Sequence, residues 1–136
     1  MSVIQERRFD YKGYPCVILY HATGYRCGYV GVPNDRKYDI DNIYCHGGIT
    51  YHDNYLRFQK DTDKQWIGFN TMHYGDAKDF ETDENLFEGD KDTLKTIEFY
   101  KGLAKFYGNA FPTPNLEYCM NECKNIVEQI IEMRNE

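Results

Sequence analysis

The chain has no apolar run approaching the ~20 residues of a membrane-spanning helix, and its opening residues, MSVIQERRFDY, include no signal-peptide core. Basic residues are also in the minority, because 16 Lys and Arg stand against 22 Asp and Glu and leave a net charge of −6. A protein that binds nucleic-acid backbones needs clustered positive charge. We therefore expect no membrane partner, no general nucleic-acid binding and a cytoplasmic location.

The signatures of several common enzyme and cofactor classes are missing as well. No GxxxxGK[ST] or GxGxxG occurs, so neither a P-loop nor a dinucleotide-binding fold is predicted, and no GxSxG nucleophile motif is present. The five cysteines include no CxxC pair and no obvious His partner in sequence. Their odd number and apolar neighbours favour reduced, buried thiols. We expect no cofactor.

What the chain has in excess is aromatic residues, with 13 Tyr and 8 Phe among 136 residues. Short stretches rich in aromatic and β-branched residues alternate with Gly, Pro and Asn turn signals, a pattern typical of an antiparallel sheet. Residues 35–43 are polar and predict a loop or a single helical turn. Strands are expected at 7–11, 15–20, 27–32, 48–52, 55–59 and 65–70, with 16–20 and 27–32 forming a hairpin.

The second half of the chain changes to helical periodicity. A helix is expected from a cap at Asp92 to a stop at Gly108. A second one follows Thr113 as cap and Pro114 as first residue, with an apolar stripe of helical spacing through 116–131.

Between the two halves, eight of the seventeen residues from Asp76 to Asp92 are acidic, which favours a solvated loop. The length suits one core. The prediction is a single α+β domain, residues 1–136: an antiparallel sheet of five to six strands covered by the C-terminal helix and a second helix.

The segment CHGGITYH, residues 45–52, is the first candidate for chemistry. The paired Gly47 and Gly48 permit positive φ and let a ligand approach the backbone, and His46 beside them can contact an anion or a polar ring. The plain alternative is a tight turn or β-bulge.

The segment WIGFNTMHYGD, residues 66–76, is the second candidate. Its strand ends at Asn70 in a loop that carries His73 and Asp76, so the carboxylate is placed to orient the imidazole; the alternative is that Asp76 caps a turn. Loops at strand ends are where function commonly lies, so His46 and His73 are expected to face each other across one pocket. These two segments also contain residues of types that ligate metals. Their spacing matches no known metal motif, so no metal is assigned. The residues are Cys45, His46, His52, His73 and Asp76.

The order of GYPC, CGYVGVP, HGGITY and WIGFNTMHYGD resembles a family of short, largely uncharacterised bacteriophage and prophage proteins with HGG(I/L)T(Y/F) and WxGF…HxGD motifs. The resemblance covers residues 13–76 well and 116–124 loosely, and Asn70 stands where family members commonly have Asp. It implies a phage accessory gene acting in the host bacterial cytoplasm. It also implies that the following residues belong to shared motifs: His46, Gly47, Gly48, Thr50, His73, Gly75 and Asp76.

Three function classes fit these observations. The first is counter-defence by binding and sequestering a small, nucleotide-type ligand, with an aromatic surface for stacking. The second is a His-based, metal-assisted or metal-free hydrolase, and the third is an acidic inhibitor that binds a host protein through residues 76–92. Enzymatic activity and homo-oligomerisation are left open. Arginines available for phosphate contact are Arg7, Arg8, Arg26, Arg36 and Arg57. The predicted ligand-binding residues are His46, Gly47, Gly48, Thr50, Tyr51, Asn70, His73 and Asp76.

Overall fold

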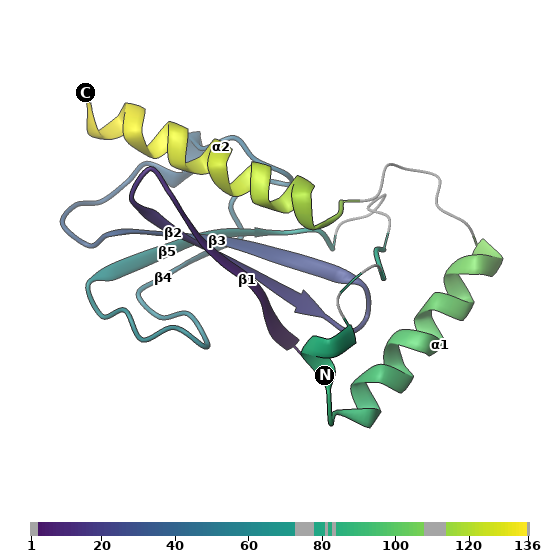
Figure 1. Cartoon of the computed structure of the whole chain (residues 1–136). Coiled ribbons are helices and arrows are strands. Elements are labelled where there is room, and N and C mark those ends of the chain that lie inside the picture. Colours follow the sequence, from purple (N-terminus) through teal and green to yellow (C-terminus); the bar gives the residue numbers. More distant parts are fainter. Residues whose placement is uncertain (1–2, 73–77, 81, 83, 108–113, 136) are drawn as a thin grey trace.

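A five-stranded antiparallel sheet with two helices forms the protein (Figure 1), which confirms the predicted α+β class. The computed structural model describes residues 3–72, 78–80, 82, 84–107 and 114–135. The strand order is β1-β2-β3-β5-β4. The strands are β1 (Val3–Tyr11), β2 (Tyr14–His21), β3 (Tyr25–Pro33), β4 (Tyr51–Asp53) and β5 (Lys64–Asn70). The helices are α1 (Lys91–Tyr107) and α2 (Leu116–Arg134), with short 3₁₀ turns η1 (Ile40–Asn42) and η2 (Glu84–Phe87).

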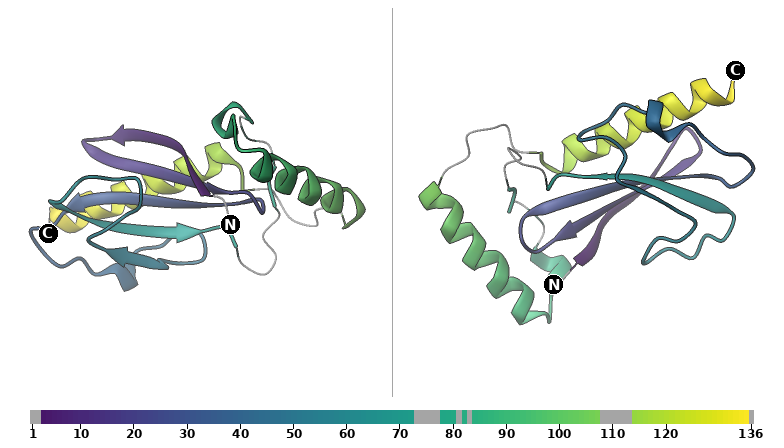
Figure 2. Two further views of the ribbon diagram at one scale, coloured as in Figure 1. Left: turned by 90° about the horizontal axis from the view of Figure 1, so that it is seen from below. Right: turned by 180° about the vertical axis from the view of Figure 1, so that it is seen from behind.

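One face of the sheet, the helix face, is covered by α2, as the views in Figures 1 and 2 show. Side chains alternate between the two faces along each strand, and Cys16, Ile18, Val30, Ile67 and Phe69 point to this side and are buried. The helix approaches closely at Gly28, where an added Cβ would lie 2.5 Å from the Phe69 ring and 3.0 Å from the Cys123 sulfur. The predicted apolar stripe of the helix is confirmed, because its buried residues are Cys119, Cys123, Ile126, Val127 and Ile130.

The opposite face, the loop face, is covered by residues 54–61 in place of the strand predicted at 55–59, and that prediction is wrong. Leu56 inserts into a cluster with Val17, Leu19 and Trp66, while Phe58 takes a left-handed φ of 67° that no strand accommodates. A short apolar run covers a sheet as readily as it extends one, and periodicity alone does not distinguish the two.

Both helix caps lie at positions other than those predicted. Asp90, not Asp92, accepts hydrogen bonds from the Thr93 hydroxyl at 2.5 Å and from the Thr93 amide at 3.1 Å, and these two bonds, the hydroxyl's first, lower the pKa of Asp90. At α2, Asn115 accepts from the Tyr118 amide at 2.9 Å, while Thr113 lies outside the described residues. In each case the capping side chain is the one whose oxygen reaches the amide three residues on.

The acidic region is exposed over most of its described part, as a solvated loop would be, but it also includes the 3₁₀ turn η2 and three buried residues, which were not predicted. Asp79, Phe80 and Phe87 are buried. The two phenylalanines join Tyr20 and Ile97 in a cluster that attaches α1 beyond one end of the sheet (Figure 1). In the described part of the chain, no helix combines the length and the hydropathy needed to cross a membrane.

All five cysteines are free thiols in the structure, and Cys45 is the one that is not fully buried. Burial raises the pKa of Cys45 to about 11 and of Cys119 to about 12. We therefore expect an aromatic-disulfide thiol reagent to label one thiol slowly in the native protein and five after denaturation without reductant. Absorbance counting of released thiolate measures both values. A denatured count of three would reveal a disulfide and contradict the reduced state.

Candidate functional site

The segment from Asn42 to Gly48 lies along α2 on the helix-face side of the molecule (Figure 2, right). Its residues alternate, because Ile43 and Cys45 pack into the core while Tyr44 and His46 bond to the helix. The Tyr44 amide donates to Gln129 Oε1 at 2.8 Å. The Tyr44 carbonyl accepts from Gln129 Nε2 and from Asn125 Nδ2, each at 2.8 Å. Three hydrogen bonds therefore fix the backbone of Tyr44 to α2.

His46 is held by the next turns of the same helix. Its amide donates to Glu122 Oε2 at 3.1 Å, and its Nδ1 lies 2.7 Å from the Tyr118 hydroxyl. The two rings meet edge to face, with centroids 5.5 Å apart and an interplanar angle of 86°. The helix residues that bond to this segment are spaced by three or four positions and so share one face of α2: Tyr118, Glu122, Asn125 and Gln129.

Gly47 and Gly48 form a turn in which both residues have a left-handed backbone, with φ of 68° and 80°. The Gly48 amide donates to the Cys45 carbonyl at 3.0 Å. A Cβ added at Gly48 would meet nothing within 4 Å, so backbone conformation is the reason for glycine here. These φ values also shorten the predicted strand at 48–52 to Tyr51–Asp53.

The remaining described site residues lie at the junction of β4 and β5. The Thr50 amide donates to the Gly68 carbonyl at 2.9 Å, and Asn70 Nδ2 donates to Thr50 Oγ1 at 3.3 Å. Tyr51 packs edge to face on Tyr29, on the loop face, at a centroid distance of 5.2 Å. His46 and Tyr51 thus contact opposite sides of the sheet edge. His73 and Asp76 lie outside the described residues, so the expected pairing of His46 with His73 stays a prediction.

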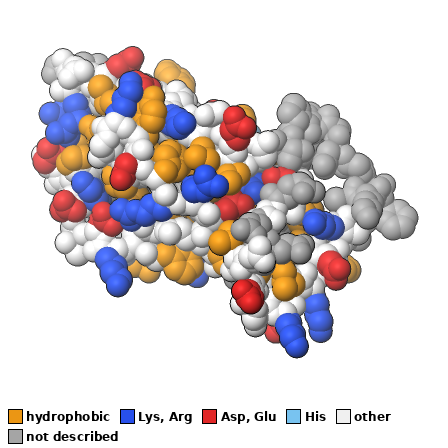
Figure 3. Space-filling view, viewed as in Figure 1, with side chains coloured by type: hydrophobic (Ala, Val, Ile, Leu, Met, Phe, Trp, Pro, Cys, Tyr) orange, Lys and Arg blue, Asp and Glu red, His pale blue; other side chains and the backbone are white. Residues whose placement is uncertain are grey.

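The structure shows which of the arginines expected to contact phosphate already have acidic partners, and whether residues that could ligate a metal lie together. Arg26 is fully buried and paired with Glu6 and Asp79, so the expectation that it contacts phosphate is wrong. Arg8 pairs with Asp61 at 3.3 Å. On the face seen in Figure 3, described Lys and Arg side chains are interspersed with Asp and Glu. Across the described residues, no group of three or more His, Cys, Asp or Glu side chains is arranged to hold a metal ion.

A Cys–His pair that sequence reading did not find lies on the loop face. Cys27 Sγ is 3.5 Å from His21 Nε2, because the two residues are diagonal neighbours across the β2–β3 hairpin. His21 also stacks on Tyr25 at 4.0 Å. Burial, with the charge of Arg57, lowers the pKa of His21 to about 4, and burial raises the pKa of Cys27. At neutral pH the pair is an uncharged thiol beside an uncharged imidazole, not the thiolate that nucleophilic catalysis needs.

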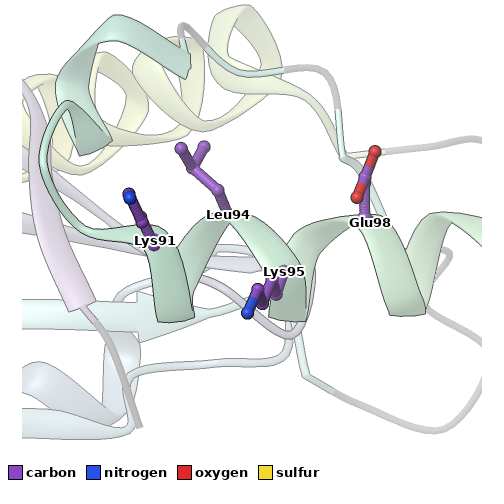
Figure 4. A pocket seen from close by; sticks show the side chains of 4 residues that line it. All are labelled: Lys91, Leu94, Lys95 and Glu98. Carbon is purple, nitrogen blue, oxygen red and sulfur yellow. The ribbon is translucent and has the colours of Figure 1, made fainter.

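Two hollows differ in what surrounds them. One, of about 330 Å³, lies against α1, and Figure 4 shows Leu94 and Glu98 projecting to one side of the helix and Lys95 to the other. Its described lining is a single helix with mixed charge. The other, of about 500 Å³, lies between Tyr44 and α2 and is lined by amide, aromatic and carboxylate side chains. The second is contiguous with the anchored segment and is the better candidate for a ligand.

No protein-family model, curated protein or solved structure matches the chain. The functional assignment therefore depends on the chemistry of the anchored segment and its neighbours.

Proposed function

We propose that this protein is a phage-encoded accessory protein that acts in counter-defence by binding and sequestering a small nucleotide-type ligand. The phage origin rests on the motif resemblance, and the binding role rests on the segment 42–48. The observation that carries it is Tyr44: the residue is 75% exposed, yet its backbone is fixed by three hydrogen bonds with α2.

An exposed aromatic ring held in this way favours binding of a planar ligand. An exposed ring gains little from packing, and because the backbone that carries it is already held by hydrogen bonds, little backbone entropy is lost when a ligand stacks on it. The turn at Gly47 and Gly48 adds accessible backbone beside His46, whose imidazole is oriented by Tyr118. Sequestration needs such a preformed surface and no reacting group.

The alternative of a hydrolase based on His46 and His73 depends on His73, which lies outside the described residues, and a thiol nucleophile beside His46 is not supported by this surface. Cys45 is the thiol adjacent to His46, but burial and then the charge of Glu122 raise its pKa to about 11. A nucleophilic thiol at neutral pH needs the opposite shift.

Replacement of His46 with alanine is expected to weaken ligand capture about fivefold while leaving the melting temperature within a few degrees. The variant removes the imidazole but keeps the backbone bond to Glu122, and one hydrogen bond to a ligand contributes about 1 kcal/mol. The assay incubates the tagged protein with small-molecule extract from phage-infected bacteria and identifies retained compounds by mass spectrometry.

His52→Ala is the matched control, because His52 is an exposed histidine of the same motif whose Nε2 pairs with Gln65 instead. It should retain the compound. Equal retention by His46→Ala and wild type, or no retained compound from any extract, would reject the proposal.

A further inference from the structure

The cavity between Tyr44 and α2, here called the amide cavity, has features that indicate which part of a nucleotide-type ligand it binds. It has a volume of about 500 Å³, within the range of small-ligand sites. Its described lining combines two side chains with extensive apolar surface and four polar ones: Asn42, Tyr44, Asn125, Gln129, Glu132 and Met133. A flat ring has a stacking surface in Tyr44 and a soft apolar contact in Met133.

Most of the polar groups in the lining already have partners. Gln129 uses both ends of its amide on the Tyr44 backbone, Asn125 donates to the Tyr44 carbonyl, and Asn42 donates to Asp39 at 2.5 Å. These amides hold the wall in place. They leave little of their hydrogen-bonding capacity for a ligand.

Glu132 is the exception in this wall. Its carboxylate makes no hydrogen bond and no ion pair with any residue that the structure describes. An ionised carboxylate only accepts hydrogen bonds, and it accepts two parallel N–H groups readily. A ligand that uses Glu132 must therefore present N–H or O–H donors, and a pair of adjacent donors fits best. Two N–H groups on a flat ring fit a carboxylate beside a stacking surface, and adenosine, which carries the same ribose hydroxyls as guanosine, separates this base contact from a ribose contact in the titration below.

The same wall is unsuited to a phosphate. No Lys or Arg belongs to its described lining, and the nearby Arg134 is engaged with Asp35 at 3.1 Å and with the Tyr38 hydroxyl. Beside Glu132, a phosphate would face a like charge with no cation to offset it.

We infer that the amide cavity binds the base of the ligand, stacked on Tyr44, through an edge with two adjacent N–H donors that bond to Glu132; guanine has this edge in its ring N–H and exocyclic amine. The sugar and any phosphate point out of the cavity. This inference rests on the proposed function and specifies the ligand class.

Calorimetric titration with guanosine, GMP and adenosine tests it. Guanosine and GMP should bind with dissociation constants within about threefold of each other, because the phosphate adds no contact. Adenosine, which lacks the ring N–H, should bind at least tenfold more weakly. E132Q should weaken guanosine binding at least tenfold, since it removes the charge and replaces one acceptor with a donor, and Y44A should do the same while Y44F retains binding. Y55A is the control, because Tyr55 is also an exposed tyrosine (66%) but lies on the loop covering the other face.

The outcomes separate this inference from the proposed function. Failure of guanosine to bind at millimolar concentration, binding of GMP without guanosine, or full guanosine affinity in E132Q would overturn the inference. If an extract compound were still captured in a His46-dependent way, the proposed function would stand without it. Guanosine binding that depends on Glu132, with no compound captured from infected cells, would instead keep the base site and reject sequestration.

Discussion

Replacement of Arg26 with methionine should destabilise the fold by ~3–5 kcal/mol, the usual cost of removing one partner from a buried ion pair. Arg26 has no exposed surface. Its Nε and Nη2 donate to the Glu6 carboxylate at 2.6 and 2.9 Å, and its Nη1 donates to Asp79 at 2.6 Å. Methionine keeps most of the volume but leaves two carboxylates, at 4% and 7% exposure, without this cation.

The cluster joins four parts of the chain, which is why the effect should reach beyond one contact. Arg26 on β3 crosses the ring of Tyr20 on β2, 4.8 Å from its centroid, to reach Glu6 on β1. The Tyr20 hydroxyl donates to the Asp79 carbonyl at 2.8 Å. Burial acts to lower the pKa of Arg26, but the bonds and charges of Glu6 and Asp79 outweigh it and raise that pKa.

Urea denaturation followed by circular dichroism measures the loss, and Arg8→Met provides the comparison. Arg8 also pairs with an aspartate, Asp61, but at the surface, where such pairs contribute about 0–1 kcal/mol. Similar midpoints for Arg26→Met and Arg8→Met would show that the buried cluster contributes little. A triple variant with Glu6→Leu and Asp79→Leu should recover stability relative to Arg26→Met alone, because it removes the carboxylates left without the cation.

This cluster also shows the limit of reading the sequence. The hairpin, the sheet class and the stripe of α2 follow from period-2 and period-3.6 patterns, which report burial of apolar side chains. Glu6 points at Arg26 because a bulge between Gln5 and Arg7 shifts the register of β1, and a bulge re-aims a side chain without a pattern of its own. The sequence therefore suggested that Arg26 was available to a ligand and that Asp79 was solvated, whereas both are buried in one ion-pair cluster.

The candidate site likewise has features that local sequence predicts and one feature that it does not. The glycine pair, His46 and the Thr50–Asn70 contact follow from local turn and strand-end chemistry. Tyr44 was not predicted, because its importance depends on Gln129, which is 85 positions away in sequence. Long-range hydrogen bonds from a helix to an extended segment leave no periodic signal. The sequence offers one hint of this contact: Asn125 and Gln129 are four positions apart on the predicted helix and so share one face, which can bind a loop such as the one that carries Tyr44.

Replacement of Ile130 with aspartate should prevent stable folding. Ile130 is fully buried in the core between α2 and the helix face of the sheet. The change removes an apolar side chain worth ~2–5 kcal/mol when truncated, and it buries a carboxylate or forces its protonation. The sum approaches the whole stability of a domain, about 5–15 kcal/mol. We expect insoluble or unfolded protein, measured by soluble yield and by the near-ultraviolet circular dichroism of the aromatic core.

Two further variants make this test specific to the buried face of α2. Asn121→Asp places the same side chain at an exposed position of the same helix and should change the unfolding free energy by less than about 0.5 kcal/mol. It is a better control than a change at Arg134, whose pairing with Asp35 an aspartate would turn into repulsion. Ile130→Val should fold and lose only ~0.5–1.5 kcal/mol. Unfolding of Ile130→Asp at the same urea concentration as Asn121→Asp would show that α2 is not the helix that covers the core. The α2 residues would then not be placed to line the amide cavity.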